Sequence, residues 1–177
     1  PAMLACAETL GAIPDCGGPV LDALRILDLE IQSMPKQAGM EFAHLNANKY
    51  RGVATFSTHD MAPMRLWWEE NPERTQRYYA TMLQKDGRAP LKMPAFIAEE
   101  VIARHLYCPS MMCIMALQDW LAVDAGLHNP DTRAERINVP GSAFGGWSYR
   151  MHIDIERLVG DVKFNEKLKL MITRSRR

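Results

Sequence analysis

The sequence lacks an excess of charge of either sign, because its 21 basic and 21 acidic residues cancel. A chain of balanced charge has no extended basic face of the kind that attracts phosphate backbones or an anionic membrane surface. We therefore expect neither a nucleic-acid partner nor a membrane partner. The short basic end at residues 174–177 is more simply explained as a solvated helix terminus.

Long apolar runs are also missing. No segment approaches the roughly 20 apolar residues needed to cross a bilayer, and the N-terminus has no charged stretch followed by an apolar region, as a signal peptide would have. Zinc-binding patterns are absent too, because no pair of histidines at ligand spacing accompanies the four cysteines, which are Cys6, Cys16, Cys108 and Cys113. We expect reduced cysteines in a cytoplasmic protein.

Apolar segments bounded by turn residues are present and predict four strands, at residues 3–7, 26–32, 53–57 and 111–117. The second strand alternates apolar and polar residues with a period of two, and the first is expected to be buried. The fourth is wholly apolar, which is typical of a strand covered on both faces, although so short a run also allows a helix.

Helices are predicted between the strands and after them, at residues 20–27, 64–68, 72–83 and 94–107, and from 161 onward. The first overlaps the strand at 26–32, so the boundary within residues 24–27 stays open. Asn71 followed by Pro72 is a favourable N-cap and first-turn pair. The polar segments 34–50 and 129–147 are expected to be long loops, which in compact domains are often functional.

Strands that alternate with helices indicate a parallel α/β sheet. Acidic residues follow three of the strands: Glu8, Asp60 and Asp119. In a (β/α)₈ barrel the active site forms at the carboxyl ends of the strands, and a complete barrel takes about 250 residues. Four strand–helix units make half a barrel, which would leave two unpaired edges and an open core. We therefore expect residues 1–177 to be part of a larger barrel domain.

Five short segments resemble, in the same order, those of the amylomaltase-type 4-α-glucanotransferases, glycoside hydrolase family 77. Each is weak alone, but together they extend over nearly the whole chain. They are Cys-Ala-Glu-Thr-Leu-Gly at 6–11, Ser-Thr-His-Asp at 57–60, Trp-Trp-Glu-Glu at 67–70, Leu-Gln-Asp-Trp-Leu at 117–121 and Arg-Ile-Asn-Val-Pro-Gly at 136–141. The resemblance implies the C-terminal half of a (β/α)₈ barrel, with the N-terminal half absent.

The resemblance also implies a retaining transfer of α-1,4-glucan segments between maltooligosaccharides, which requires two carboxyl groups about 5–5.5 Å apart. Glu8 matches the family's general acid/base and Asp60 its stabiliser of the transition state. His59 and Asn138 match sugar-binding positions. Transfer between sugars requires no metal and no redox cofactor.

The nucleophile of the family lies in an Arg-x-Asp-His segment that does not occur in this chain and would precede Pro1. We therefore expect the isolated chain to be inactive and to need the missing half of its own barrel as a partner. Three departures from the family are visible. Thr9 stands where Asp is common and Met61 where many members have Asn, and Gly-Gly-Trp-Ser at 145–148 replaces a bulkier sequence.

Other roles remain open at several of these positions. His59 could satisfy a buried polar contact, Asn138 could form a turn, and Asp119 could lie near the site or, as we prefer, cap the helix after the last strand. Core packing is expected for one of Trp67 and Trp68, for His105, and for Met111, Met112 and Met115.

Two alternative functions also remain open. A retaining α-glucosidase or amylase would use the same chemistry with water as the acceptor. An inactive glucan-binding or structural remnant would use none of it. Product analysis on maltotriose separates the two enzymes, because transfer yields longer oligosaccharides and hydrolysis only shorter ones.

Overall fold

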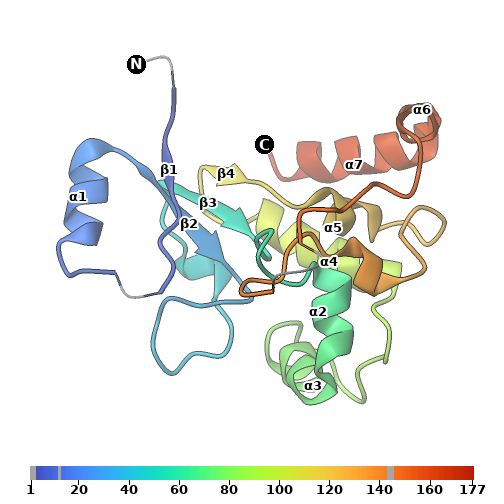
Figure 1. The fold of residues 1–177 in the computed structure, drawn as a ribbon, viewed down its shortest axis with the longest axis horizontal. Coiled ribbons are helices and arrows are strands. Elements are labelled where there is room, and N and C mark those ends of the chain that lie inside the picture. Colours follow the sequence, from blue (N-terminus) through green and yellow to red (C-terminus); the bar gives the residue numbers. More distant parts are fainter. Residues whose placement is uncertain (1–2, 12, 143–145) are drawn as a thin grey trace.

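The computed structural model describes residues 3–11, 13–142 and 146–177 of the chain. Its strands lie in the middle of the molecule, with the first helix on one side and the others on the opposite side (Figure 1). The elements along the chain are β1 (Cys6–Ala7), α1 (Gly17–Leu24), β2 (Leu27–Ile31), the 3₁₀ helix η1 (Leu45–Ala47), β3 (Gly52–Thr55), α2 (Met64–Glu70), α3 (Pro72–Thr81), α4 (Ala95–Leu106), β4 (Met112–Cys113), α5 (Leu117–Leu121), the 3₁₀ helix η2 (Thr132–Glu135), α6 (Ile155–Gly160) and α7 (Val162–Arg174).

The four strands form one parallel sheet in the order β1-β2-β3-β4, which confirms the predicted parallel α/β architecture. Each strand pairs with the next one along the chain, and the register places Cys6 beside Leu27 and Leu29 beside Val53. Within the described ranges, β1 and β4 each pair along one edge only. Because all strands run in the same direction, the loops that follow them emerge at a single edge of the sheet.

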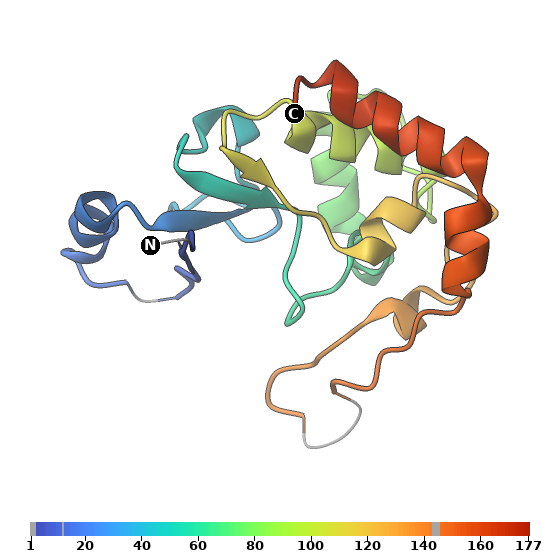
Figure 2. The same cartoon turned by 90° about the horizontal axis from the view of Figure 1, so that it is seen from above.

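The two faces of the sheet differ in what covers them. Successive strand residues point to opposite faces, so Ala54 and Phe56 face the helices while Val53 and Thr55 line an open hollow on the other side. Figure 2 shows α4 and α7 on one side of the sheet, with the loop after β3 and the segment after η2 extending the other way. The loops that carry the candidate site therefore border the uncovered face.

An aromatic cluster joins β3 to the helices behind it. Phe56 meets the ring of Trp67 at 5.1 Å between centroids, and Phe42 meets that of Tyr78 at 5.2 Å, both edge to face. Such pairs add about 0.5–1.5 kcal/mol each beyond the area they bury. Trp68 is buried as well as Trp67, so both tryptophans are core residues where only one was expected. The cluster fixes α2 against the end of β3 and thereby fixes the loop between them.

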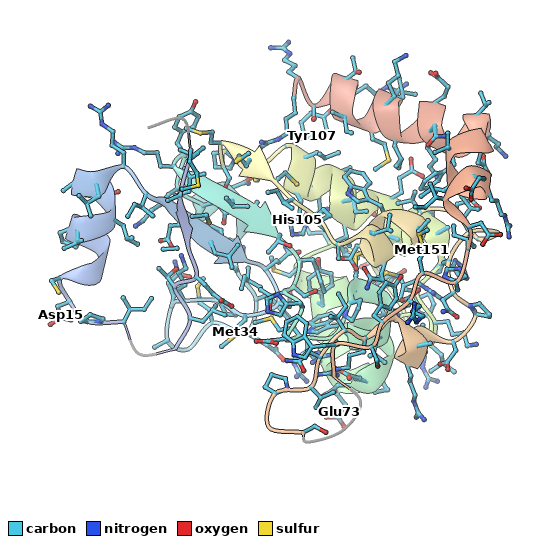
Figure 3. The ribbon with its side chains drawn as sticks, turned by 45° about the horizontal axis from the view of Figure 1, so that its top comes forward. Asp15, Met34, Glu73, His105, Tyr107 and Met151 are labelled. Atoms are coloured by element: carbon cyan, nitrogen blue, oxygen red, sulfur yellow. The ribbon has the colours of Figure 1, made fainter. Side chains whose placement is uncertain are left out.

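His105 is packed in the core, as predicted. It lies on α4 between that helix and the sheet (Figure 3), fully buried, with Nδ1 2.8 Å from the carbonyl oxygen of Val101. Burial lowers its pKa to about 4, because a low-dielectric surrounding disfavours the charged imidazolium. His105 is therefore neutral at pH 7.

The helix termini confirm several sequence-based predictions. The Asn71 side chain accepts a hydrogen bond from the backbone N–H of Arg74 at 3.0 Å, which caps α3, and Asp161 caps α7 in the same way. Arg25 adopts a left-handed conformation (φ 55°) and ends α1 at Leu24. That turn separates α1 from β2, which begins at residue 27, and so resolves the boundary within residues 24–27 that the sequence left undecided.

Two predicted strands are wrong in extent. The run at 111–117 contributes only Met112 and Cys113 to β4, and α5 begins at Leu117. Met111 and Met112 are both 39% exposed, and Met115 is buried. The strand at 3–7 shrinks to Cys6–Ala7, the two residues that pair with β2, and Cys6 is exposed rather than buried.

The predicted long loops are present at 34–50 and 129–147, each interrupted by a short 3₁₀ helix, although residues 143–145 lie outside the described ranges. None of the described helices is long and apolar enough to cross a membrane. The four cysteines carry free thiols. Across the residues that the structure describes, no group of three His, Cys, Asp or Glu side chains is arranged to hold a metal ion.

Candidate active site

An open hollow of about 400 Å³ lies on the uncovered face of the sheet. Its floor is apolar, and polar groups gather where the strands end, which is the usual composition of a ligand site. The residues lining it are Cys6, Leu29, Val53, Thr55, Ser57, Thr58, His59, Met61, Pro63, Ile114, Met115, Ala116, Gln118 and Ile137. The Ser-Thr-His segment after β3 thus forms part of its wall.

The loop after β3 is a tight turn built by its own hydroxyl groups. The Thr55 hydroxyl donates to the carbonyl of Ser57 at 2.9 Å, and the backbone N–H of Asp60 donates to the Thr58 hydroxyl at 3.3 Å. The backbone N–H of Met61 closes the turn on the Thr58 carbonyl at 3.0 Å. Ser and Thr favour such turns because their side chains bond to nearby backbone groups. The turn presents His59 and Asp60 at the edge of the hollow.

Asp60 is the centre of a polar contact that joins two distant segments. Its Oδ1 accepts a hydrogen bond from the Asn138 amide at 2.6 Å and lies 3.6 Å from Nε2 of His59. The Asp60 side chain is 37% exposed and that of His59 47%, so both can reach a ligand. Three of the four predicted site residues are therefore brought together, although Asp60 and Asn138 stand 78 positions apart.

Asn138 is held in place by Arg136. The guanidinium of Arg136 donates from Nε to the carbonyl of Asn138 at 3.1 Å and from Nη1 to the Glu70 carboxylate at 2.8 Å. Glu70 is the last residue of α2. The same helix therefore fixes both the loop that carries Asp60 and the segment that carries Asn138.

A buried polar cluster underlies this segment. Arg65 donates to the Glu135 carboxylate at 2.8 Å and to the carbonyl of Asn129 at 2.7 Å, and the Gln118 amide donates to the backbone carbonyl of Glu135 at 3.0 Å. Burial raises the pKa of Glu135, and the Arg65 guanidinium opposes the rise. These hydrogen bonds join α2, α5 and η2, although Nε of Arg65 and Oε2 of Glu135 have no hydrogen-bond partner among the residues that the structure describes.

Asp119 does not have the predicted role. It lies within α5, and its Oδ1 accepts the backbone N–H of Met64 at 2.8 Å, so it caps the start of α2 rather than the helix after the last strand. Its Oδ2 has no hydrogen-bond partner among the residues that the structure places. Full burial raises the pKa of Asp119 to about 7, and the nearby Glu135 carboxyl adds to the rise.

Glu8 lies at the same edge of the sheet but outside the Asp60 contact. It directly follows β1, which ends at Ala7, and it is not among the residues that line the hollow. Its side chain is exposed, and within the described ranges no hydrogen bond or ion pair holds the carboxylate. Since β1 and β3 flank β2, their axes are about 10 Å apart at this edge.

Thr9 faces the other side of the sheet and makes a contact that the sequence did not suggest. Its hydroxyl donates to Oδ1 of Asp28 on β2, and Lys36 pairs with the same carboxylate oxygen at 2.6 Å. Although burial raises the pKa of Asp28, Lys36 and Thr9 bring it below its usual value. An aspartate at position 9 would set a second carboxylate against this one, so the donor hydroxyl suits the site.

Sequence reasoning missed the Arg136–Glu70 clamp, the Arg65–Glu135 pair and the contact between His59 and Trp147, whose ring centroids are 5.0 Å apart. The two ion pairs join residues about 65–70 positions apart, and no local pattern reveals them. A signal for Trp147 did exist, because a large aromatic residue next to glycine in a polar loop is unusual.

Comparison with known proteins identifies one family. A family model described as 4-alpha-glucanotransferase matches residues 1–155. The chain is 34% identical over 175 residues to 4-alpha-glucanotransferase DPE2 of Oryza sativa subsp. japonica, covering 99% of this chain and 18% of the rice protein. It is 28% identical to a 4-alpha-glucanotransferase of Chlamydia muridarum, covering 94% of this chain and 32% of that protein.

A solved structure shows the same fold. The amylomaltase of Streptococcus agalactiae in complex with acarbose superposes with a TM-score of 0.71 at 22% identity, over 97% of this chain and 32% of that one. The four-stranded parallel sheet therefore corresponds to part of an amylomaltase structure. The chain spans between about a fifth and a third of the length of the relatives that it matches.

Proposed function

We propose that this chain, which belongs to the 4-alpha-glucanotransferase family, forms the C-terminal half of a (β/α)₈ barrel and one side of an active site that transfers α-1,4-glucan segments between maltooligosaccharides. The contact of Asp60 with Asn138 and His59 at the carboxyl edge of the sheet is the observation that carries the proposal. A carboxylate flanked by an amide and an imidazole, half open to solvent, is suited to grip the hydroxyl groups of a sugar ring.

Glu8 is proposed as the general acid/base. In the first step its carboxyl group gives a proton to the departing glycosidic oxygen while a nucleophilic carboxylate from outside these residues bonds to the anomeric carbon. In the second step Glu8 takes the proton from the 4-hydroxyl of an acceptor glucan, whose oxygen displaces the nucleophile. The carboxylate is exposed and has no fixed partner among the residues that the structure places, so it is free to approach both leaving group and acceptor.

Asp60 is proposed to stabilise the positive charge that develops on the sugar ring in the oxocarbenium-like transition state. The amide donor on its Oδ1 limits rotation of the carboxylate, and the Arg136 clamp limits movement of that donor. Fixing such a group in advance is worth more than the same charge in water, because it need not reorganise during the reaction.

The chain alone is proposed to be inactive. Removal of a nucleophile costs several orders of magnitude in rate, and no Arg-x-Asp-His segment is present. The uncovered face and the single-sided pairing of β1 and β4 are consistent with docking of further barrel strands. Disproportionation of maltotriose by residues 1–177 on their own would contradict this part of the proposal.

The test is product analysis on maltotriose after the nucleophile-bearing half has been supplied and the enzyme reassembled. Longer oligosaccharides together with glucose are expected, whereas shorter products alone would indicate a hydrolase. Glu8→Gln should lower the rate by at least about 10²–10⁴-fold, because that is the usual contribution of general acid–base catalysis. Asp15→Asn, at another exposed acid of the N-terminal segment, is the matched control and should keep the wild-type rate.

A further inference from the structure

Trp147 is a large apolar side chain left in solvent beside the proposed site. It is 67% exposed, whereas Trp67 and Trp68 are almost fully buried. Its ring lies 5.0 Å from that of His59, tilted by 45°. His59 in turn lines the hollow and contacts Asp60. The indole therefore extends the wall of the hollow outward from its polar edge.

The backbone holds Trp147 in an unusual conformation. Its φ is 62°, in the left-handed region that bulky residues rarely adopt. The backbone N–H of Trp147 donates to the carbonyl of Ile137 at 2.7 Å, which ties it to the neighbour of Asn138. Strained residues of this kind persist only where the surrounding structure holds them, and they cluster at functional sites.

Gly146 adds a second constraint. A Cβ at this position would lie 2.5 Å from Oδ1 of Asn138, closer than any real contact. Any larger residue at this position would therefore require the Asn138 side chain, which contacts Asp60, to move. The close approach brings the indole to the same side of the hollow as the Asp60 carboxylate.

From these contacts we infer that Trp147, together with His59, forms a stacking platform for the glucosyl unit next to the one that Asp60 grips. A pyranose ring has an apolar face of C–H groups that packs on an aromatic ring, while its hydroxyls, at the rim, bond to polar neighbours. The bend of an α-1,4 link directs the next ring out of the hollow, toward an exposed aromatic at its mouth. The inference rests on the proposed function and specifies which residue recognises the substrate.

The indole N–H signals provide the test, since the chain has four tryptophans. The ¹⁵N-labelled chain, reassembled with an unlabelled nucleophile-bearing half, is titrated with maltotriose, and Trp147→Phe assigns the signal of residue 147. We expect that signal to shift in a saturable manner while those of Trp67 and Trp68 stay in place. Cellotriose, which is β-linked, should cause less shift, and an equal shift would overturn the preference for α-1,4 links.

Variants separate failure of the platform from failure of the proposed function. Trp147→Ala should weaken maltotriose binding by about tenfold, as the loss of a central aromatic contact does, and Trp147→Phe should restore part of it. Tyr50→Ala, at an aromatic of similar exposure before β3, should bind like the wild type. Unchanged binding in Trp147→Ala would overturn the platform alone. An absence of maltotriose binding by the wild type would count against the proposed glucan site as well.

Discussion

Replacing Asp119 by Asn should remove a pH dependence from the stability of the fold. Asp119 is fully buried and caps α2 through Oδ1, a role that the amide oxygen of Asn can keep. Its pKa rises to about 7 from an ordinary value of 3.8, chiefly because burial disfavours the carboxylate. At a pH between these two pKa values, the Asp119 carboxyl is therefore protonated in the folded state but deprotonated in the unfolded state.

The magnitude follows from proton linkage. Between about pH 4 and pH 7 the native chain binds more protons than the unfolded chain, so the free energy of unfolding falls as pH rises. One fully linked proton changes it by about 1.4 kcal/mol per pH unit, which sets an upper limit of about 4 kcal/mol over the whole interval. The Asp119→Asn variant has no titrating proton at this position. Its free energy of unfolding should therefore fall less than that of the wild type as the pH rises.

The assay is urea denaturation followed by tryptophan fluorescence at pH 5 and at pH 8. Glu135 also has a raised pKa and interacts with Asp119, so the difference between wild type and Asp119→Asn measures the Asp119 contribution together with its coupling to Glu135. From pH 5 to pH 8, we expect the free energy of unfolding of the wild type to fall by at least about 1 kcal/mol more than that of the variant. Asp86→Asn, at an exposed carboxylate, should give a curve parallel to the wild type. A parallel curve for Asp119→Asn would refute the reasoning.

Two further substitutions test the geometry around the site. Gly146→Ala places a methyl group against Asn138 and should weaken maltotriose binding by about tenfold or more. The control is Gly160→Ala, where no atom lies within 4 Å of the added methyl group and binding should not change. Equal binding in both variants would contradict the close approach of Gly146 to Asn138. Thr9→Asp sets a second carboxylate against Asp28 and should lower the free energy of unfolding by about 1–3 kcal/mol at pH 7, with less loss at pH 3, as measured by urea denaturation. A stability unchanged at pH 7 would show that the two side chains do not meet.

The local features of the fold could be predicted from the sequence. The alternation of residues 26–32 gave β2, and the Asn71–Pro72 pair gave the start of α3, because both depend on neighbours within a few positions. The length of the fourth strand could not be predicted. A wholly apolar run indicates burial on both faces, but here Ile114 lines the open hollow and is 56% exposed. Only Met112 and Cys113 pair with β3, which sequence patterning does not reveal.

The site was predictable as a set of residues but not as a set of contacts. Motif resemblance selected Asp60, His59 and Asn138, which the fold brings together, and Glu8, which it leaves apart from them. The groups that hold them in place were not predicted. Asp119 caps a helix that begins 55 residues earlier in the chain, and such a pairing depends on tertiary packing rather than on local sequence.

The central proposal is that Glu8 and Asp60 flank one glucose ring at the carboxyl edge of the sheet. A crystal structure of the reassembled enzyme with a bound maltooligosaccharide tests it most directly. We predict that Asp60 bonds to hydroxyls of a ring while still accepting from Asn138, and that the Glu8 carboxyl lies within about 3 Å of the glycosidic oxygen of the same ring. A glucan bound away from Asp60, or a Glu8 too distant to reach that oxygen, would contradict the account.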